Sequence, residues 1–454
     1  MARLFGSSGV RGLVNSYLTP ELACKVGLAV AAHVKAGKAL VARDTRVSGS
    51  MIEDALVSGL LAGGVCVSLV GAVATPVLAY LTRLLKADVG FMLTASHNPP
   101  QYNGIKIFDG DSLSYTDENQ NAVEKIIGEN SFVMADWREV GAVSSVDASH
   151  FYVEMARKAA ELRKQWRVVV DPGCGATFEV GPAVLKAAGC RVTALNAQPD
   201  GFFPARSSEP TAESLKDLAR VVKAAGADVG VAFDGDGDRV AFVDEEGCFV
   251  DFDRSLAAYA AYCLKRAGGG TVVTNVEASM CVETMAEAVG GRVVRTRVGD
   301  VYISEAIKRC DAVFGGEPCG AWVHPRFHYC PDGPLSAVLL LKALEAEGKG
   351  LREFVGEVPE YVTLRENIAC RNDLKHKLVA GIEEPLRSAF SGYKDFSKVD
   401  GVRLSLENGW LLIRASGTEP LIRLTVEGES LKAANDIMGK GTALVEEQLE
   451  ELKK

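Results

Sequence analysis

The chain has 454 residues, too many for one hydrophobic core, and at roughly 150 residues per domain it predicts three to four domains. Charged residues make up 24% of the sequence and hydrophobic residues 48%, values that exclude a disordered, collagen-like or coiled-coil protein. The 59 acidic and 50 basic residues give a net charge of −9, which argues against a nucleic-acid-binding protein.

The N-terminal sequence MARLFGSSGVRG lacks the apolar segment of a signal peptide. Residues 55–82 carry no charge and are long enough to span a bilayer. However, Gly63-Gly64, a β-branched alternation and Thr75-Pro76 predict helix, turn, strand and turn there, not a membrane span. The odd number of cysteines, 11 without a CxxC pair, fits a reducing compartment better than a disulfide framework. We therefore expect a cytoplasmic protein without a membrane partner.

Three segments repeat the order strand, helix, strand, helix, strand, and each ends in an unusual loop. They cover residues 39–99, 167–239 and 270–320. Their third strands, which read ADVGF, ADVGV and CDAVF, are the most similar parts. Short apolar strands alternating with amphipathic helices predict α/β layers with mostly parallel sheets. Because ligands in such sheets bind beyond the strand C-termini, the three loops could face one central cleft.

After about residue 365 the pattern changes to helix, hairpin strands and a C-terminal helix. Asn408-Gly409 between alternating strands predicts a type I′ hairpin turn. The fold class we expect is α/β, with three similar α/β domains containing mixed sheets and a smaller C-terminal α+β domain. The predicted domains cover residues 1–148, 149–252, 253–365 and 366–454.

A serine-containing loop, TASHNP, follows the last strand of the first repeat, and NGIK follows that loop. Ser96 is followed directly by His97, and Lys106 adds a cation and a proton-transfer candidate to the serine. Taken alone, the loop could equally be a Ser or Asx turn with a structural histidine. Arg11 lies in a second small-residue loop near the N-terminus, where a frayed terminus is the alternative.

Three aspartates alternate with glycines at the end of the second repeat: Asp234, Asp236 and Asp238. Because glycine permits a tight turn, the three carboxylates can converge on one hard cation, and Mg²⁺ is the natural candidate. An EF-hand does not fit, since Arg239 occupies the position that requires glycine and no helix flanks the loop. A solvated acidic turn and a phosphatase with Asp234 as nucleophile remain alternatives.

The C-terminal region contains the loop RASGTEP, with a second arginine close behind it. Two guanidinium groups and two hydroxyl groups form a donor set that binds a phosphate dianion. A surface turn is the alternative. The predicted phosphate-binding residues are Arg414, Ser416, Gly417, Thr418 and Arg423.

The five motifs SGVRG, TASHNP with NGIK, DGDGDR, GEPCG and RASGTEP occur in the order and spacing of the α-D-phosphohexomutase superfamily, which the chain resembles over essentially its whole length. The resemblance implies an enzyme with four domains around a central cleft and a bound hexose 1,6-bisphosphate as intermediate. It implies that Ser96 is carried as phosphoserine and, with the three aspartates, holds Mg²⁺. It further implies that Arg11 and Arg239 steady the phosphoryl group, that Lys106 and His97 transfer protons, and that the RASGTEP loop binds the phosphate that is not transferred.

The sugar preference depends on the third repeat. The residues VGD at 298–300 resemble phosphoglucosamine mutases, and an acidic Asp300 suits a 2-ammonium group. Cys319 replaces the serine of the common GExSGH loop and an alanine replaces its histidine, which resembles archaeal-type members. Glu317 remains to bind ring hydroxyls, and Arg297 joins the predicted sugar site.

The resemblance therefore implies an isomerase that interconverts glucosamine 6-phosphate and glucosamine 1-phosphate. A phosphomannomutase or phosphoglucomutase is the alternative. A sugar-phosphate-binding protein without turnover would require a broken serine or aspartate motif, and both are intact. The expected partner is a small sugar phosphate, and the chain is expected to be a monomer or homodimer.

Overall fold

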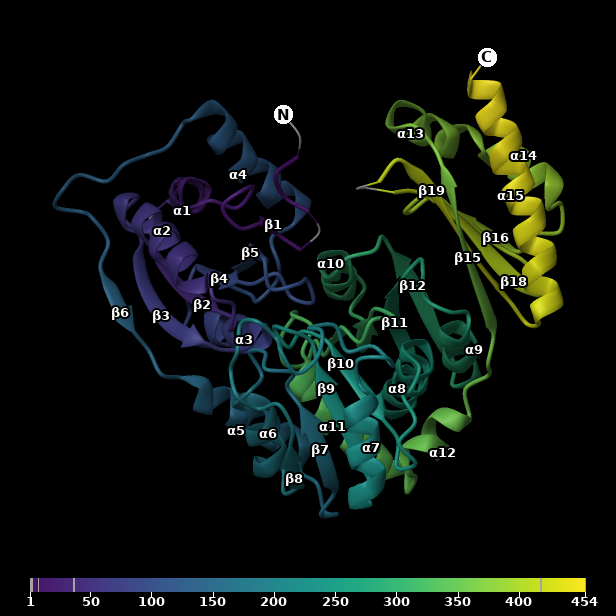
Figure 1. Ribbon diagram of the computed structural model, residues 1–454, viewed down its shortest axis with the longest axis horizontal. Helices are drawn as coiled ribbons and strands as arrows, with labels where there is room; N and C mark the ends of the chain where they lie inside the picture. Colours follow the sequence, from purple (N-terminus) through teal and green to yellow (C-terminus); the bar gives the residue numbers. More distant parts are fainter. Residues whose placement is uncertain (1–2, 7, 36, 417–418, 454) are drawn as a thin grey trace.

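The computed structural model describes residues 3–6, 8–35, 37–416 and 419–453 (Figure 1). Its strands form four sheets, and each sheet consists of strands that are consecutive in the chain. Among the described residues, no helix combines the length and apolar character that crossing a membrane requires.

The first sheet has the strand order β1-β5-β4-β2-β3-β6, and β5 runs antiparallel to both of its neighbours. Its strands are β1 (Val10–Leu13), β2 (Lys38–Arg43), β3 (Cys66–Ala72), β4 (Val89–Leu93), β5 (Tyr102–Asp109) and β6 (Val143–Ser145). The helices of this unit are α1 (Pro20–Val34), α2 (Gly49–Ala62), α3 (Thr75–Leu84) and α4 (Asp117–Glu129).

The second and third sheets have four strands each, in the orders β10-β9-β7-β8 and β12-β11-β13-β14. The second unit contains α5 (Ser149–Ala160), β7 (Arg167–Asp171), α6 (Val180–Ala187), β8 (Arg191–Ala194), α7 (Lys216–Ala225), β9 (Val229–Phe233) and β10 (Val240–Val243). The third contains α8 (Phe252–Ala267), β11 (Gly270–Asn275), α9 (Cys281–Ala288), β12 (Gly291–Thr296), α10 (Asp300–Cys310), β13 (Phe314–Gly316), β14 (Trp322–Val323), α11 (Gly333–Glu347) and α12 (Leu351–Gly356).

These three sheets share one topology, which confirms the predicted repeat. In each, the first strand of the repeat lies between the second and the third, and all three are parallel. The next strand of the chain then runs antiparallel beside the third: β5, β10 and β14. The predicted mixed α/β sheets are therefore present, and each functional loop lies between a parallel strand and its antiparallel neighbour.

The C-terminal sheet is antiparallel, in the order β15-β19-β18-β17-β16, and is covered by helices (Figure 1). Its elements are β15 (Val362–Ala369), α13 (Asn372–Gly381), α14 (Glu383–Ala389), β16 (Asp395–Ser397), β17 (Val402–Ser405), β18 (Gly409–Ala415), β19 (Leu421–Gly428) and α15 (Leu431–Lys453). The predicted hairpin joins β17 to β18, but the prediction of its turn type was wrong. The Leu406 N–H donates to Gly409 O, so Glu407 and Asn408 are central, and neither has the positive φ that a type I′ turn requires.

The first three units share one hydrophobic core, whereas the C-terminal unit has its own. The shared core joins buried side chains of all three sheets, such as Met92, Phe233 and Trp322. A small hydrophobic cluster, centred on Val276, Trp410 and Leu412, packs the C-terminal sheet against the third unit, and polar contacts such as the Arg414–Glu277 pair add to it. The predicted boundaries after 148 and 252 stay predictions, and the one after 365 falls within β15. The C-terminal unit stands apart from the first three, at the upper right of Figure 1.

Candidate active site

The loops that follow β4 and β9 meet at a buried contact. Ser96 Oγ donates to Asp234 Oδ2 at 2.6 Å, and both side chains are buried. Gly235 allows this approach, since a Cβ atom there would lie 2.4 Å from the carbonyl oxygen of Ser96. Two of the predicted motifs are thus in direct contact.

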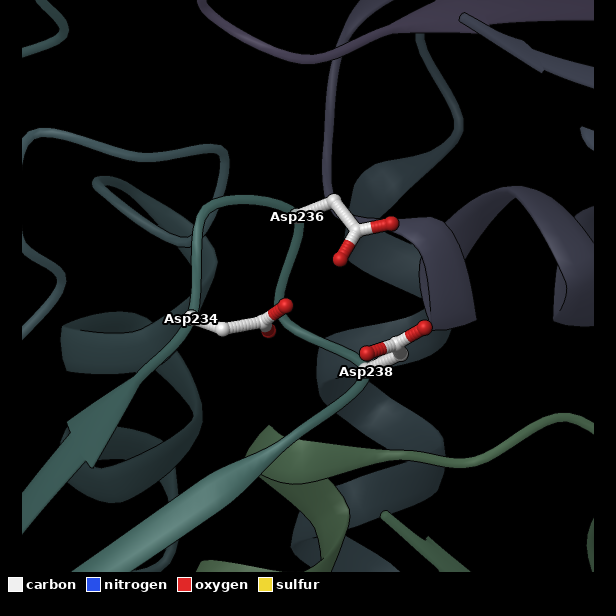
Figure 2. A group of neighbouring side chains, drawn as sticks. All are labelled: Asp234, Asp236 and Asp238. Carbon is white, nitrogen blue, oxygen red and sulfur yellow. The ribbon is translucent and has the colours of Figure 1, made fainter. Parts of the chain in front are cut away.

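The three aspartates project from the single loop between β9 and β10 (Figure 2). All are buried, and one ligand oxygen from each lies within 4.8 Å of the others. Asp234 Oδ1 accepts from the backbone N–H groups of Gly237 and Arg239, which fixes that carboxylate. Burial, followed by the neighbouring carboxylates of Asp236 and Asp238, raises the pKa of Asp234 well above its usual range.

This carboxylate group fits a hard divalent cation. Asp236 Oδ1 and Asp238 Oδ1 are buried and have no hydrogen-bond partner among the described residues. Buried carboxylate oxygens without partners are unfavourable unless a cation or donor compensates them. A set made only of oxygen ligands is what Mg²⁺ prefers over softer metals.

Lys106, on β5, lies between a carboxylate of the aspartate group and the carboxylate of Asp300. Its Nζ is 2.6 Å from Asp238 Oδ2 and 3.3 Å from Asp300 Oδ2. Burial lowers the pKa of Lys106, but Asp238 and Asp300 outweigh that effect and hold the pKa well above its usual value. Lys106 is therefore an ammonium group at neutral pH and links the acidic loop to the start of α10.

His97 and Arg11 lie beside the serine. His97 Nδ1 is 3.3 Å from Ser96 Oγ, and Arg11 Nη1 donates to Asn98 Oδ1 at 2.8 Å. Burial and the guanidinium groups of Arg239 and Arg11 lower the pKa of His97 to about 3. The imidazole is therefore neutral in this arrangement.

Of the predicted sugar residues, Glu317 bonds to the loop before α10, whereas Arg297 reaches α4. Glu317 Oε1 accepts from Asn275 Nδ2 at 2.9 Å and from the Gly299 N–H at 2.8 Å, and burial raises the pKa of Glu317. Burial raises the pKa of Cys319 to about 12, which keeps it a thiol. Arg297 points elsewhere: its Nη2 lies 2.6 Å from Asp117 Oδ2 on α4, and it covers the Tyr302 ring.

The C-terminal loop holds its arginines in ion pairs. Arg414 Nη2 is 2.8 Å from Asp400 Oδ2, and Nη1 pairs with Glu277 of the third unit. Arg414 Nε is buried and has no partner among the described residues. Arg423 pairs with Glu419 at 2.9 Å, and Ser416 is buried. Gly417 and Thr418 lie outside the described residues.

Several residues around the site had no sequence signal. Thr75, at the start of α3, donates through Oγ1 to Asp236 Oδ2 at 2.6 Å, whereas the sequence pattern indicates only a turn at Thr75-Pro76. Glu277 and Asp400 pair with a predicted arginine, as described above. Lys375, buried on α13, donates to the carbonyl oxygens of Ser416 at 2.5 Å and Glu419 at 3.2 Å. Each of these contacts joins elements far apart in the chain, so only the fold reveals them.

A cavity of about 1060 Å³ lies away from these loops. It is lined by side chains of α3, α5, α8 and α11, among them Tyr80, Tyr259 and Lys342, and by none of the predicted site residues. We assign no part of the reaction to it.

Comparisons with known proteins agree with this architecture. Four family models match the chain in order: "Phosphoglucomutase/phosphomannomutase, alpha/beta/alpha domain I" at residues 2–134, domain II at 150–247, domain III at 251–361 and the C-terminal domain at 367–440. Two archaeal proteins named "Probable phosphoglucosamine mutase" are similar over their full lengths. The one from Methanopyrus kandleri is 44% identical over 456 residues, covering 100% of both chains, and the one from Pyrococcus abyssi is 42% identical, covering 99% of both.

A solved structure shows the same fold. The chain matches a phosphoglucomutase/phosphomannomutase family protein from Burkholderia thailandensis with a TM-score of 0.87 and 28% identity. The match covers 98% of this chain and 97% of the other.

Proposed function

Because the chain belongs to the phosphoglucomutase/phosphomannomutase family, and is thus a phosphohexomutase, we propose that it interconverts glucosamine 6-phosphate and glucosamine 1-phosphate. The observation that carries the proposal is the contact between Ser96 Oγ and the buried aspartate group, at 2.6 Å. A hydroxyl in that position can carry a phosphoryl group beside a bound cation. The names of the two archaeal relatives support glucosamine as the sugar.

In this mechanism Ser96 is carried as phosphoserine. Its phosphoryl group passes to the free hydroxyl of the sugar phosphate: the new P–O bond forms on the sugar as the hydroxyl loses its proton, the bond to Ser96 Oγ breaks, and Ser96 Oγ takes up a proton. The resulting hexose 1,6-bisphosphate turns over in the site, and its other phosphoryl group returns to Ser96. Asp234, Asp236 and Asp238 would hold Mg²⁺, which when bound offsets the negative charge of the transferring phosphoryl group.

The chain's own residues position the reaction and move protons. Arg11, beside Asn98, and Arg239, which follows the aspartates, supply the positive charge that steadies the phosphoryl group. His97 Nδ1 is close enough to Ser96 Oγ to exchange a proton with it, and Lys106 Nζ lies between the acidic loop and the sugar residues.

The third unit would recognise the sugar. Asp300 is buried and its Oδ2 lies 3.3 Å from Lys106 Nζ, but neither of its carboxylate oxygens has a hydrogen-bond partner in the described part of the chain. A 2-ammonium group would supply the missing donors, which supports an amino sugar. Glu317 is fixed through one oxygen by two donors, so its other oxygen can accept from ring hydroxyls. Cys319 is proposed to border the same site, whereas the Arg297 guanidinium, paired with Asp117 on α4, is not assigned to it.

The C-terminal loop would bind the phosphate that is not being transferred. Arg414, with its unpartnered Nε, Ser416 and Arg423 supply donors, and Gly417 and Thr418 complete the proposed set. We further propose a cytoplasmic enzyme that acts as a monomer or homodimer. All 11 cysteines are free, which is consistent with a reducing compartment.

Initial rates on the 1-phosphates of glucosamine, mannose, glucose and N-acetylglucosamine at one enzyme concentration test the substrate. We expect glucosamine 1-phosphate to be the fastest. We expect Asp300→Asn to reduce turnover of that sugar selectively, by about fivefold to a hundredfold for loss of an ion pair, while Glu317→Gln reduces turnover of every sugar. Faster turnover of mannose or glucose 1-phosphate by the unmodified enzyme would favour a phosphomannomutase or phosphoglucomutase instead. Equal losses on all sugars in Asp300→Asn would remove Asp300 from specificity.

A further inference from the structure

A closed ring of hydrogen bonds surrounds the backbone of Ser96. The Ser96 N–H donates to Thr94 Oγ1 at 2.8 Å, and Thr94 Oγ1 donates to Asp44 Oδ2 at 2.7 Å. Arg46 Nε donates to the same Asp44 oxygen at 2.9 Å, and Arg46 Nη2 donates to the carbonyl oxygen of Ser96 at 2.8 Å. Both backbone polar groups of Ser96 are therefore held by one connected set of side chains.

The ring is shielded from water. Asp44, Arg46, Thr94 and Ser96 are each no more than 2% exposed. Hydrogen bonds among buried groups are costly to break, because water cannot replace the lost partner. A satisfied network of this kind holds the groups it joins in one geometry.

Arg46 has no donor left for a ligand. A guanidinium has five N–H donors, and besides the two already described, Nη2 donates to Asn98 O, and Nη1 donates to Pro99 O and Tyr102 O. Four of the five acceptors are carbonyl oxygens, three on the loop that carries Ser96 and one at the start of β5. Arg46 therefore organises that loop and does not itself bind phosphate.

The ring holds Ser96 in an unfavourable backbone conformation. Its φ is 49°, in the left-handed region, which costs a non-glycine residue on the order of 1–2 kcal/mol. In this conformation Ser96 Oγ reaches Asp234 Oδ2. Relaxation of φ to its usual range would move Oγ away from the aspartate group.

We propose that Thr94, Asp44 and Arg46 are positioning residues for phosphoryl transfer, and that their ring keeps Ser96 Oγ aimed at the aspartate group. The proposal rests on the proposed role of Ser96 as phosphoryl carrier. The serine side chain alternates between a free hydroxyl and a phosphoserine in each catalytic cycle, whereas the ring forms hydrogen bonds only with the serine backbone. The ring can thus stay closed as the side chain changes.

Thr94 offers a matched pair of substitutions. Thr94→Val keeps the shape of the side chain and removes the hydroxyl, whereas Thr94→Ser keeps the hydroxyl. Thr82→Val is the control, because Thr82 is also fully buried and donates to Leu78 O at 2.8 Å, but lies on α3 outside the ring. Three quantities are measured for each variant: kcat and KM on glucosamine 1-phosphate, the rate at which glucose 1,6-bisphosphate phosphorylates the protein by intact mass, and the thermal unfolding midpoint.

We expect Thr94→Val to lower kcat and the phosphorylation rate by about ten- to a hundredfold, since misplacement of a reacting atom by about 1 Å costs about a hundredfold. KM should stay within about twofold, because substrate binding is not touched. Thr94→Ser should retain most of the activity. Thr82→Val should lose a similar amount of stability without loss of kcat.

A kcat for Thr94→Val equal to that of Thr82→Val would overturn the proposal, as would equal losses in Thr94→Val and Thr94→Ser. If Thr94→Val does not fold, Asp44→Asn provides the same test, and an unchanged kcat in that variant would also overturn it. Failure of glucose 1,6-bisphosphate to phosphorylate the unmodified protein on Ser96 would instead refute the carrier role. The two failures are therefore distinguishable.

Discussion

Replacing Asp236 with asparagine should stabilise the metal-free protein and abolish its response to Mg²⁺. The substitution keeps the shape of the side chain, and an amide oxygen can still accept from Thr75 Oγ1. What changes is the charge, because the buried loop then carries two carboxyl groups in place of three. The variant thus separates the fold of the loop from its capacity to bind a cation.

The size of the effect follows from the geometry. At the 4.8 Å that bounds the separation of the ligand oxygens, two unit charges in an effective dielectric of about 20 repel by roughly 3.5 kcal/mol. The raised pKa of Asp234 means that protonation already removes part of this repulsion. We therefore expect Asp236→Asn to raise the free energy of unfolding by about 1–2 kcal/mol in the metal-free state. This is the part of the repulsion that protonation does not remove. Mg²⁺ at 100 times its Kd should stabilise the unmodified protein by about 2.7 kcal/mol.

Unfolding midpoints in a chelator and across a Mg²⁺ titration measure both effects. Asp54→Asn is the control, because Asp54 is an exposed aspartate on α2, and it should behave as the unmodified protein in both conditions. A Mg²⁺-independent midpoint for the unmodified protein would refute the metal site. A lower midpoint for Asp236→Asn in chelator would refute the argument that the three carboxylates repel one another.

Three further predictions concern other parts of the structure. Burial raises the pKa of Asp253 from 3.8 to about 7, so its contribution to stability should fall as the pH rises from about 4 to about 7 and level off above; unfolding midpoints between pH 5 and 8 should show this fall, and Asp253→Asn should make it shallower. Asp400→Asn should lower KM for the sugar phosphate by up to about fivefold, since a partly exposed ion pair with Arg414 is worth about 1 kcal/mol or less; an unchanged or higher KM would mean that the pair does not compete with phosphate. Lys375→Met should raise KM for every sugar phosphate by about tenfold, because two loop carbonyls lose a charged donor worth about 1.5–3 kcal/mol per bond, whereas the exposed Lys377→Met on the same helix should have no effect on the measured KM.

The sequence predicts the repeat because its signal is local. The third strands of the repeats carry nearly the same apolar residues, and each is followed at once by a loop of unusual composition. Each loop follows the carboxyl end of a parallel strand, where ligands bind, so the sequence predicts that both loops face one cleft. The contact between Ser96 and Asp234 itself joins two different sheets and depends on how the two units pack. The aspartate group follows from the spacing of its members.

The contacts between units could not be predicted, because side-chain direction is set by packing between distant elements. Arg297 shares the loop before α10 with the predicted sugar residues, yet its guanidinium reaches Asp117 on α4. The Arg414 side chain belongs to the predicted phosphate loop, yet Glu277 and Asp400 hold it. The prediction of the hairpin turn was wrong for a related reason. The strand register, which is fixed by burial, shifts the two central turn residues one position toward the N-terminus, from Asn408-Gly409 to Glu407-Asn408.

One physical requirement explains why four of the loops around the site pack against a buried or partly buried cation. Irregular backbone at the end of a buried strand leaves carbonyl oxygens that neither a helix nor a sheet satisfies. Arg46 donates to four such oxygens at the serine loop. Arg206 donates to the carbonyl oxygen of Phe233, directly before Asp234, and to that of Asp171. Arg295 does the same for the loop after β11, and Lys375 for the C-terminal loop. Because the carbonyl oxygens are neutralised by cations inside the protein, fewer partial negative charges oppose the phosphate groups that these loops are proposed to receive.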